Sequence, residues 1–92
     1  METYLGIDGG GSKTRAQLVD AEGNILHTAE SGPSNLNAYD FDVVRASLTE
    51  VIQQCIDATG EKPRASCFGL AGCSATSTRK ALDSIIAPFE LK

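Results

Sequence analysis

Apolar and polar residues alternate along much of the first third of the chain. A period of two is the pattern of strands with one buried face, so it predicts strands over residues 1–8, 13–20 and 25–30. Short segments rich in Gly, Asp and Asn separate them, which indicates an antiparallel meander. The positions that share one face of the first strand are Thr3, Leu5 and Ile7.

Residues 40–58 change to the spacing of an amphipathic helix, with apolar side chains three and four positions apart. Gly60, placed as a C-cap, and Pro63 beyond it predict the end of this helix. The apolar stripe that we expect to face the core consists of Phe41, Val44, Leu48, Val51, Ile52 and Cys55.

A fourth strand and a second helix follow. Residues 65–70 are apolar on both faces, as expected for a buried parallel strand. The second helix would be capped by Ser74 or Thr76 and run to about residue 86, where Pro88 stops it. Its inward-facing residues would be Leu82, Ile85 and Ile86. The predicted order of elements is therefore βββαβα.

Composition narrows the class of protein. The 92 residues are 41% hydrophobic, enough for one small domain or part of a larger one. A net charge of −4, few aromatic residues and no Trp argue against a nucleic-acid partner. No segment approaches the roughly 20 apolar residues that span a bilayer, and the start lacks a signal-peptide pattern. We therefore expect a cytoplasmic protein with no membrane partner.

The cysteines and the lone histidine do not form a metal site in the sequence. Cys55, Cys67 and Cys73 contain no C-x-x-C pair, and His27 has no neighbouring ligands. Free thiols in a reducing compartment are the simpler interpretation. We expect Cys55 and Cys67 in the core, Cys73 in a loop, and His27 as a surface or half-buried strand residue.

The first hairpin carries the strongest chemical signal. Its sequence is Asp8, Gly9, Gly10, Gly11, Ser12, Lys13 and Thr14. Glycines let the backbone reach φ > 0 and let a ligand approach, and successive N–H groups in such a turn form an anion site. An aspartate at the mouth can hold a divalent cation through water. The motif predicts a site for the phosphates of ATP. A plain hairpin, a turn-capping Asp8 and a solvated Lys13 are the alternatives.

The order βββαβα with a glycine hairpin resembles the first half of a ribonuclease H-like domain, an α/β fold with helices packed on a mixed sheet. It is similar to the version in the actin, sugar-kinase and heat-shock chaperone ATPase superfamily. Gly-Pro-Ser-Asn at residues 32–35 and Gly-Leu-Ala-Gly at residues 69–72 resemble the N-acetylglucosamine and glucosamine kinase group. That group shares a family with the BadF/BadG/BcrA/BcrD-type ATPases. By this resemblance, residues 1–92 are the N-terminal part of an actin-like ATPase domain.

The resemblance also implies roles for single residues. ATP phosphates would be bound by Gly9, Gly10, Gly11, Ser12, Lys13 and Thr14, and Mg²⁺ by Asp8 through water. An amino sugar would be bound by Ser34, Asn35, Ala71 and Gly72. The catalytic base of the family would lie beyond Lys92, so we expect these residues alone to be inactive. For the full-length protein we expect a homodimer.

Other interpretations stay open at this stage. The chain could belong to an ATPase that activates a partner, as in the 2-hydroxyacyl-CoA dehydratase and benzoyl-CoA reductase systems. A nuclease would need a second acid near the fourth strand, which residues 65–72 lack. A binding-only module is a further alternative, and it would leave a sheet edge open to self-association. Ser34 and Asn35 could be an ordinary helix-entry pair, and Gly69 and Gly72 could serve packing alone.

Overall fold

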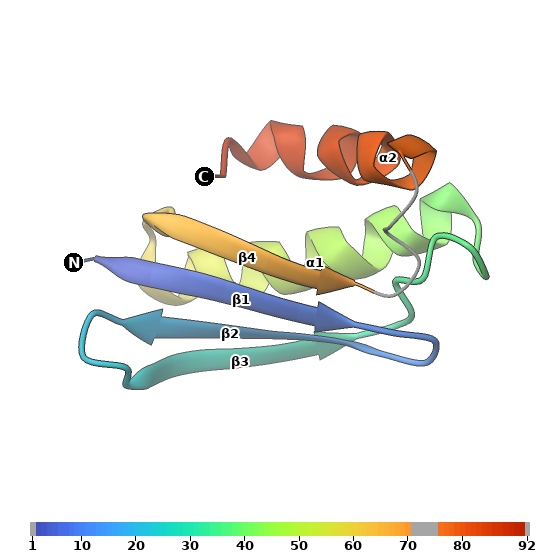
Figure 1. Cartoon of the computed structure of the whole chain (residues 1–92). Coiled ribbons are helices and arrows are strands. Elements are labelled where there is room, and N and C mark those ends of the chain that lie inside the picture. The colour runs from blue at the N-terminus through green and yellow to red at the C-terminus, as the bar shows by residue number, and fades with distance from the viewer. Residues whose placement is uncertain (1, 71–75, 92) are drawn as a thin grey trace.

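The computed structural model describes residues 2–70 and 76–91 (Figure 1). Its elements are β1 (Thr3–Gly9), β2 (Thr14–Asp20), β3 (Ile25–Ser31), α1 (Phe41–Thr59), β4 (Ala65–Leu70), α2 (Thr76–Ile86) and the 3₁₀ turn η1 (Ala87–Phe89). The predicted order βββαβα is confirmed, with boundaries that differ by one or two residues. The predicted cap at Ser74 and the predicted loop position of Cys73 lie outside the described residues.

The four strands form one mixed sheet in the order β3-β2-β1-β4. β1 pairs antiparallel with β2 and parallel with β4, and β2 pairs antiparallel with β3. Because β1 and β4 run in the same direction, their carboxyl ends meet at one end of the sheet. The β1–β2 hairpin and the segment between β3 and α1 reach that same end, on the right of Figure 1.

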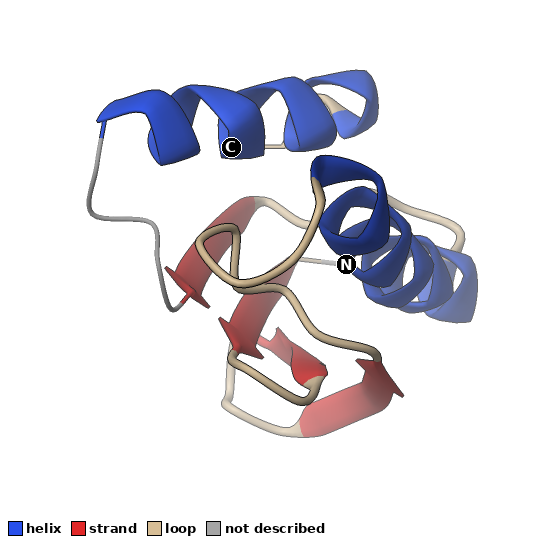
Figure 2. Cartoon of the chain, turned by 90° about the vertical axis from the view of Figure 1, so that its right-hand side faces the viewer, coloured by secondary structure: helices blue, strands red, loops and turns tan. Residues whose placement is uncertain are grey.

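Both helices cover the same face of the sheet (Figure 2). The strand alternation predicted from sequence places the inner side chains of β1 and β2 under α1, and these residues are buried. The α1 stripe packs on them, with Ser47 buried beside it. The hydrophobic core consists of Leu5, Ile7, Ala16, Leu18, Ala29, Val44, Leu48, Val51, Ile52, Cys55 and Ile85.

Three predictions about burial are wrong, namely that β4 is buried on both faces, that Cys67 is in the core and that Phe41 faces the core. β4 is not buried on both faces, because both described helices lie on one side of the sheet; Cys67 is therefore exposed rather than part of the core. Phe41 is 41% exposed, because it opens α1 ahead of the turn where the helix meets the strands.

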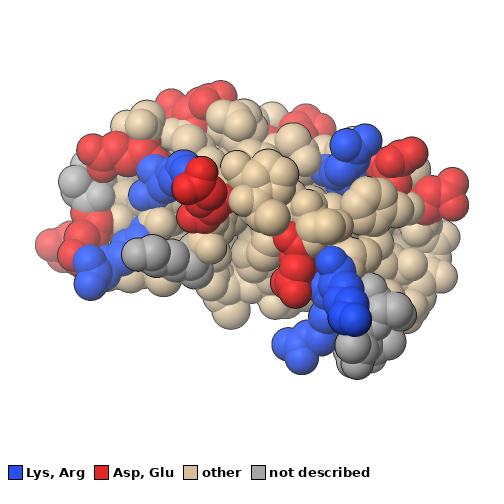
Figure 3. All heavy atoms as spheres, turned by 90° about the horizontal axis from the view of Figure 1, so that it is seen from above, with Lys and Arg blue, Asp and Glu red and all other residues tan. Residues whose placement is uncertain are grey.

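Helix α1 ends as its sequence predicts. Gly60 adopts φ 74°, and its N–H donates to the carbonyl of Ile56 at 2.8 Å, which is a left-handed C-cap. Side chains of both signs are mixed over the helix-covered side of the molecule (Figure 3). None of the described helices is long and apolar enough to cross a membrane.

Candidate functional site

The glycine loop, residues 9–13, connects β1 to β2. Gly9 pairs with Thr14 across the hairpin, and the N–H of Gly10 donates to the carbonyl of Lys13 at 3.0 Å. The prediction that these glycines supply φ > 0 is wrong, since the positive-φ residues in the described part are Gly23, Gly60 and Glu90. The turn closes with ordinary backbone angles, so these glycines are not needed for an unusual φ. What they provide is space, because they carry no side chain.

Space is needed most at Gly9, which is buried at the end of β1. A Cβ built on it would overlap the Oγ of Ser34 and lie 2.6 Å from Cδ2 of Leu70. Gly10 and Gly11 differ from it, because a Cβ at either would meet no atom within 4 Å. Gly9 therefore lets Ser34 and Leu70 approach the backbone of β1 closely. Gly10 and Gly11 leave the outer side of the loop open to a ligand.

The segment that leads from β3 into α1, here called the Ser34 loop (residues 32–40), is fastened to the glycine loop. The N–H of Ser34 donates to the carbonyl of Gly10 at 3.2 Å, and the hydroxyl of Tyr39 donates to the carbonyl of Gly11 at 2.7 Å. At the base of the hairpin, the hydroxyl of Thr14 donates to the carbonyl of Gly32 at 2.7 Å. Two loops that are far apart in sequence thus form one unit.

The two predicted sugar ligands in this loop have different surroundings. Ser34 is fully buried, and its Oγ has no hydrogen-bond partner within residues 2–70 and 76–91. Asn35 is half-buried, and its Oδ1 accepts from the N–H of Asn37 at 2.9 Å, so that oxygen closes a local turn. Ala71 and Gly72 lie outside the described residues.

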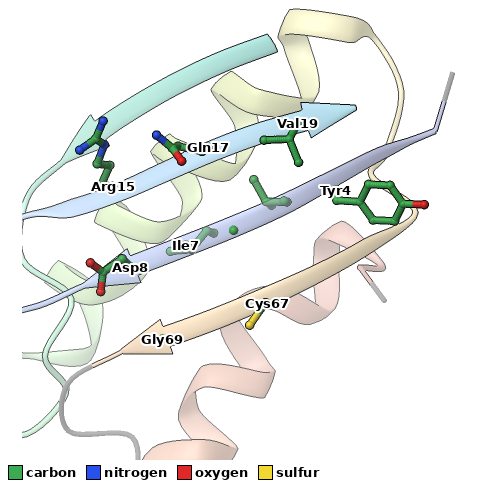
Figure 4. A pocket seen from close by; sticks show the side chains of 10 residues that line it. Tyr4, Ile7, Asp8, Arg15, Gln17, Val19, Cys67 and Gly69 are labelled. Atoms are coloured by element: carbon green, nitrogen blue, oxygen red, sulfur yellow. The ribbon is translucent and has the colours of Figure 1, made fainter. Parts of the chain in front are cut away.

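Asp8 stands at the carboxyl end of β1, on the sheet face opposite the helices. Its neighbours across the sheet are Arg15 on β2 and Gly69 on β4 (Figure 4). Among the described residues, a Cβ at Gly69 would have ordinary contacts only, the nearest at 3.9 Å from the carbonyl oxygen of Ile7. Because Gly69 has no side chain, nothing projects from β4 next to the Asp8 carboxylate, and the sheet surface there is open to a ligand.

A cleft of about 370 Å³ lies over this end of the hairpin. Its charges are balanced, with two carboxylates and two basic groups. The Nζ of Lys13 is 3.8 Å from Oε2 of Glu30, and both side chains are more than half exposed, so this ion pair is weak. A phosphate could therefore take the place of the Glu30 carboxylate beside Lys13. The cleft is lined by Asp8, Gly9, Gly10, Ser12, Lys13, Arg15 and Glu30.

The site contains too few protein ligands for a metal ion held by the protein alone. The described residues include no group of three or more His, Cys, Asp or Glu side chains that could bind one. One exposed carboxylate suits a Mg²⁺ that keeps its waters and is held mainly by nucleotide phosphates. The donor set at Asp8 therefore fits that mode of binding.

Residues 5–90 match the model of the BadF/BadG/BcrA/BcrD ATPase family. The chain belongs to this family. ATP is therefore the nucleotide to expect for this BadF-type family member.

The chain is similar to curated sugar kinases. It is 33% identical over 89 residues to the N-acetylmuramic acid/N-acetylglucosamine kinase of Clostridium acetobutylicum, covering 94% of this chain and 29% of the relative. It is 33% identical over 63 residues to the glucosamine kinase of Vibrio cholerae, covering 68% of this chain and 21% of the relative. The chain thus spans less than a third of the length of either relative.

Solved structures agree on the fold. A proposed N-acetylglucosamine kinase from Chromobacterium violaceum superposes with a TM-score of 0.62 at 23% identity, over 95% of this chain and 31% of that one. The ethanolamine utilization protein EutJ from Carboxydothermus hydrogenoformans gives 0.71 at 13% identity, over 100% of this chain and 35% of that one. The fold is that of the actin-like ATPases.

The structure of this BadF-type chain brings most of the predicted phosphate site together. Asp8, Gly9, Gly10, Ser12 and Lys13 line one cleft. Two predicted contacts have other partners here: the hydroxyl of Thr14 is buried against the Ser34 loop, and the N–H of Gly10 is used inside the turn.

Three residues at the site, Arg15, Glu30 and Tyr39, were not predicted from the sequence. Strand alternation carried the signal for Arg15 and Glu30, because the hairpin register places Arg15 opposite Asp8 and Glu30 opposite Arg15. No local pattern marks Tyr39, whose contact spans 28 residues of sequence.

Proposed function

We propose that the chain is the ATP-phosphate- and sugar-binding N-terminal part of a longer, homodimeric hexosamine kinase, called the full-length protein below. Its substrate would be glucosamine or N-acetylglucosamine. Membership of the BadF-type family and similarity to curated kinases for these sugars support the proposal. The observation that carries it is the fastening of the Ser34 loop to the glycine loop, because a sugar kinase must hold its sugar beside the γ-phosphate.

In this proposal each part of the cleft has a separate task. Outward-facing amides of the glycine loop would donate to phosphate oxygens, and Lys13 and Arg15 would offset their charge. Asp8 would hold a water of the Mg²⁺ that neutralises charge on the phosphates. The amide nitrogen of Asn35 would donate to a sugar hydroxyl. The Oγ of Ser34 would need the loop to shift before it could reach a sugar, because it is fully buried.

Phosphoryl transfer depends on positioning and on charge stabilisation from all sides of the reacting group. In this proposal the described residues would form one wall of such a cleft, and no general base is assigned among them. We therefore expect the 92 residues alone to release no ADP in the presence of Mg-ATP and sugar.

A coupled ADP-release assay on the full-length protein tests the proposed function. Mg-ATP is supplied with glucosamine, N-acetylglucosamine, N-acetylmuramic acid or glucose. We expect strong stimulation by an amino sugar and little by glucose. Slow hydrolysis that ignores every sugar would refute the kinase and favour an ATPase that activates a partner. Light scattering on the same sample tests the homodimer, which a monomeric mass would contradict.

Lys13 provides a variant that links this activity to the described cleft. Lys13→Ala should raise the KM for ATP about tenfold, since hydrogen bonds to charged groups contribute about 1.5–3 kcal/mol. Lys80→Ala, an exposed lysine on α2, is the matched control and should leave the KM unchanged. Equal KM values for the two variants would remove Lys13 from the phosphate site.

A further inference from the structure

Two neighbouring carbonyl groups of the glycine loop are held from the same side. The carbonyl of Gly10 accepts from the N–H of Ser34, and the carbonyl of Gly11 accepts from the hydroxyl of Tyr39. Both donors belong to the Ser34 loop. The contact from Tyr39 is the shorter of the two, at 2.7 Å against 3.2 Å.

These two contacts determine where the next two N–H groups point. A peptide group is planar and trans, so its C=O and its N–H point in opposite directions. The structure has no cis peptide among the described residues. With the carbonyls of Gly10 and Gly11 turned toward the Ser34 loop, the N–H groups of Gly11 and Ser12 are turned away from it. Ser12 lines the cleft beside Asp8, which is the side proposed for phosphate.

The same two N–H groups are free to bind a ligand. Within residues 2–70 and 76–91, no hydrogen bond from the N–H of Gly11 or of Ser12 is present, whereas the N–H of Gly10 closes the turn on Lys13. A Cβ added at Gly11 would meet no atom of the described residues within 4 Å, so the space beside this glycine is open. An adjacent pair of N–H groups with a common direction is the arrangement that binds a phosphate oxygen.

We propose that Tyr39 is a positioning residue for the nucleotide. Its hydroxyl holds the Gly11 carbonyl and thereby aims the Ser12 N–H at the phosphate. Because the N–H of Tyr39 also donates to the carbonyl of Asn35 at 3.0 Å, the phosphate-binding amide and the proposed sugar ligand share one anchor. The inference rests on the proposed function and deepens it, since it assigns the residue that ties the two substrates together.

Tyr39→Phe removes only the hydroxyl and therefore tests the proposal directly. Tyr4→Phe is the matched control, because Tyr4 also donates one exposed hydrogen bond, to Glu2 at 3.3 Å, at the far end of β1. Both variants and the wild type are studied as full-length proteins. The measurements are calorimetric Kd values for the Mg²⁺ complex of a non-hydrolysable ATP analogue, KM values for ATP and sugar, and the thermal midpoint.

We expect Tyr39→Phe to raise both the analogue Kd and the KM for ATP about two- to tenfold, the effect of one hydrogen bond. The KM for sugar and the thermal midpoint should match those of Tyr4→Phe. Equal analogue Kd values for the two variants would overturn the proposal, as would a loss confined to the thermal midpoint. A wild type that binds no nucleotide would also overturn it.

The outcomes separate this inference from the proposed function. A wild type that binds the analogue but phosphorylates no sugar refutes the kinase; a weaker analogue Kd in Tyr39→Phe then still supports the positioning role. A wild type that is an active kinase, with Tyr39→Phe unchanged, refutes the positioning role alone.

Discussion

The close packing of Ser34 against Gly9 predicts how much stability Gly9→Ala should lose. The added Cβ would overlap the Oγ of Ser34 and lie 3.2 Å from its Cβ and 2.6 Å from Cδ2 of Leu70. The end of the Leu70 side chain can rotate away, but Ser34 is fully buried and cannot. The substitution should therefore push the Ser34 loop off the glycine loop.

The expected magnitude follows from two opposing effects. Overpacking of a buried site costs about 1–3 kcal/mol. Replacing glycine by alanine at ordinary backbone angles returns about 0.4–1 kcal/mol, because it restricts the unfolded chain. Subtracting these ranges gives a net loss of stability between about 0 and 2.6 kcal/mol, centred at about 1.3 kcal/mol, which should lower the thermal midpoint of the full-length protein by a few degrees. The KM for ATP should rise as well, because the displaced Ser34 loop would weaken the hydrogen bond from the Ser34 N–H to the Gly10 carbonyl.

A double-mutant cycle identifies the contact that is responsible. Ser34→Ala alone should be neutral or stabilising by about 1 kcal/mol, because it removes a buried hydroxyl that has no partner. Combined with Gly9→Ala, it should recover about 1 kcal/mol or more as a coupling energy. Gly6→Ala is the control: it lies on the same strand, a Cβ there meets no atom within 4 Å, and the midpoint should not fall. Additive effects of Gly9→Ala and Ser34→Ala on stability would show that the clash with Ser34 is not the cause of the loss.

Two further predictions concern the rest of the described chain. The Asn24 backbone N–H, foremost among several turn donors, lowers the pKa of Asp20 below its ordinary value of 3.8. The folded state thus favours the carboxylate, and this stabilisation is present above pH 3.8 and lost as the pH falls through the folded-state pKa. Asp20→Ala should therefore lower the thermal midpoint at pH 7 and converge with wild type in acid; a difference independent of pH would contradict this. Burial raises the pKa of the Cys55 thiol, so site-resolved alkylation of the 92 residues at pH 8 should modify the exposed Cys67 before Cys55, and faster labelling of Cys55 would contradict the burial pattern.

The local elements could be predicted from the sequence because each depends on nearby residues. Alternation in β1 and the stripe of α1 follow from the periods of strand and helix, and Gly60 ends α1 through its own φ. The glycine hairpin was evident for the same reason. Even the position of Arg15 beside Asp8 was implicit in the hairpin register.

The errors arose where distant segments decide the outcome. Whether Cys67 is buried depends on which face of the sheet the helices cover, and the strand sequence does not encode that face. The role of Tyr39 depends on the path of the Ser34 loop across the end of the sheet. The glycines of the hairpin were expected to supply unusual backbone angles, but Gly9 instead provides space for Ser34, a residue 25 positions later.

An amide hydrogen-exchange footprint of the full-length protein tests most directly whether the glycine loop binds the nucleotide and the Ser34 loop binds the sugar. Exchange is compared without ligand, with the Mg²⁺ complex of a non-hydrolysable ATP analogue, and with the amino sugar that gives activity. We expect the nucleotide to slow exchange in residues 9–13 and the sugar to slow exchange in residues 34–39. If the nucleotide slowed exchange elsewhere and left the exchange rates of residues 9–13 unchanged, the glycine loop would not be the phosphate site.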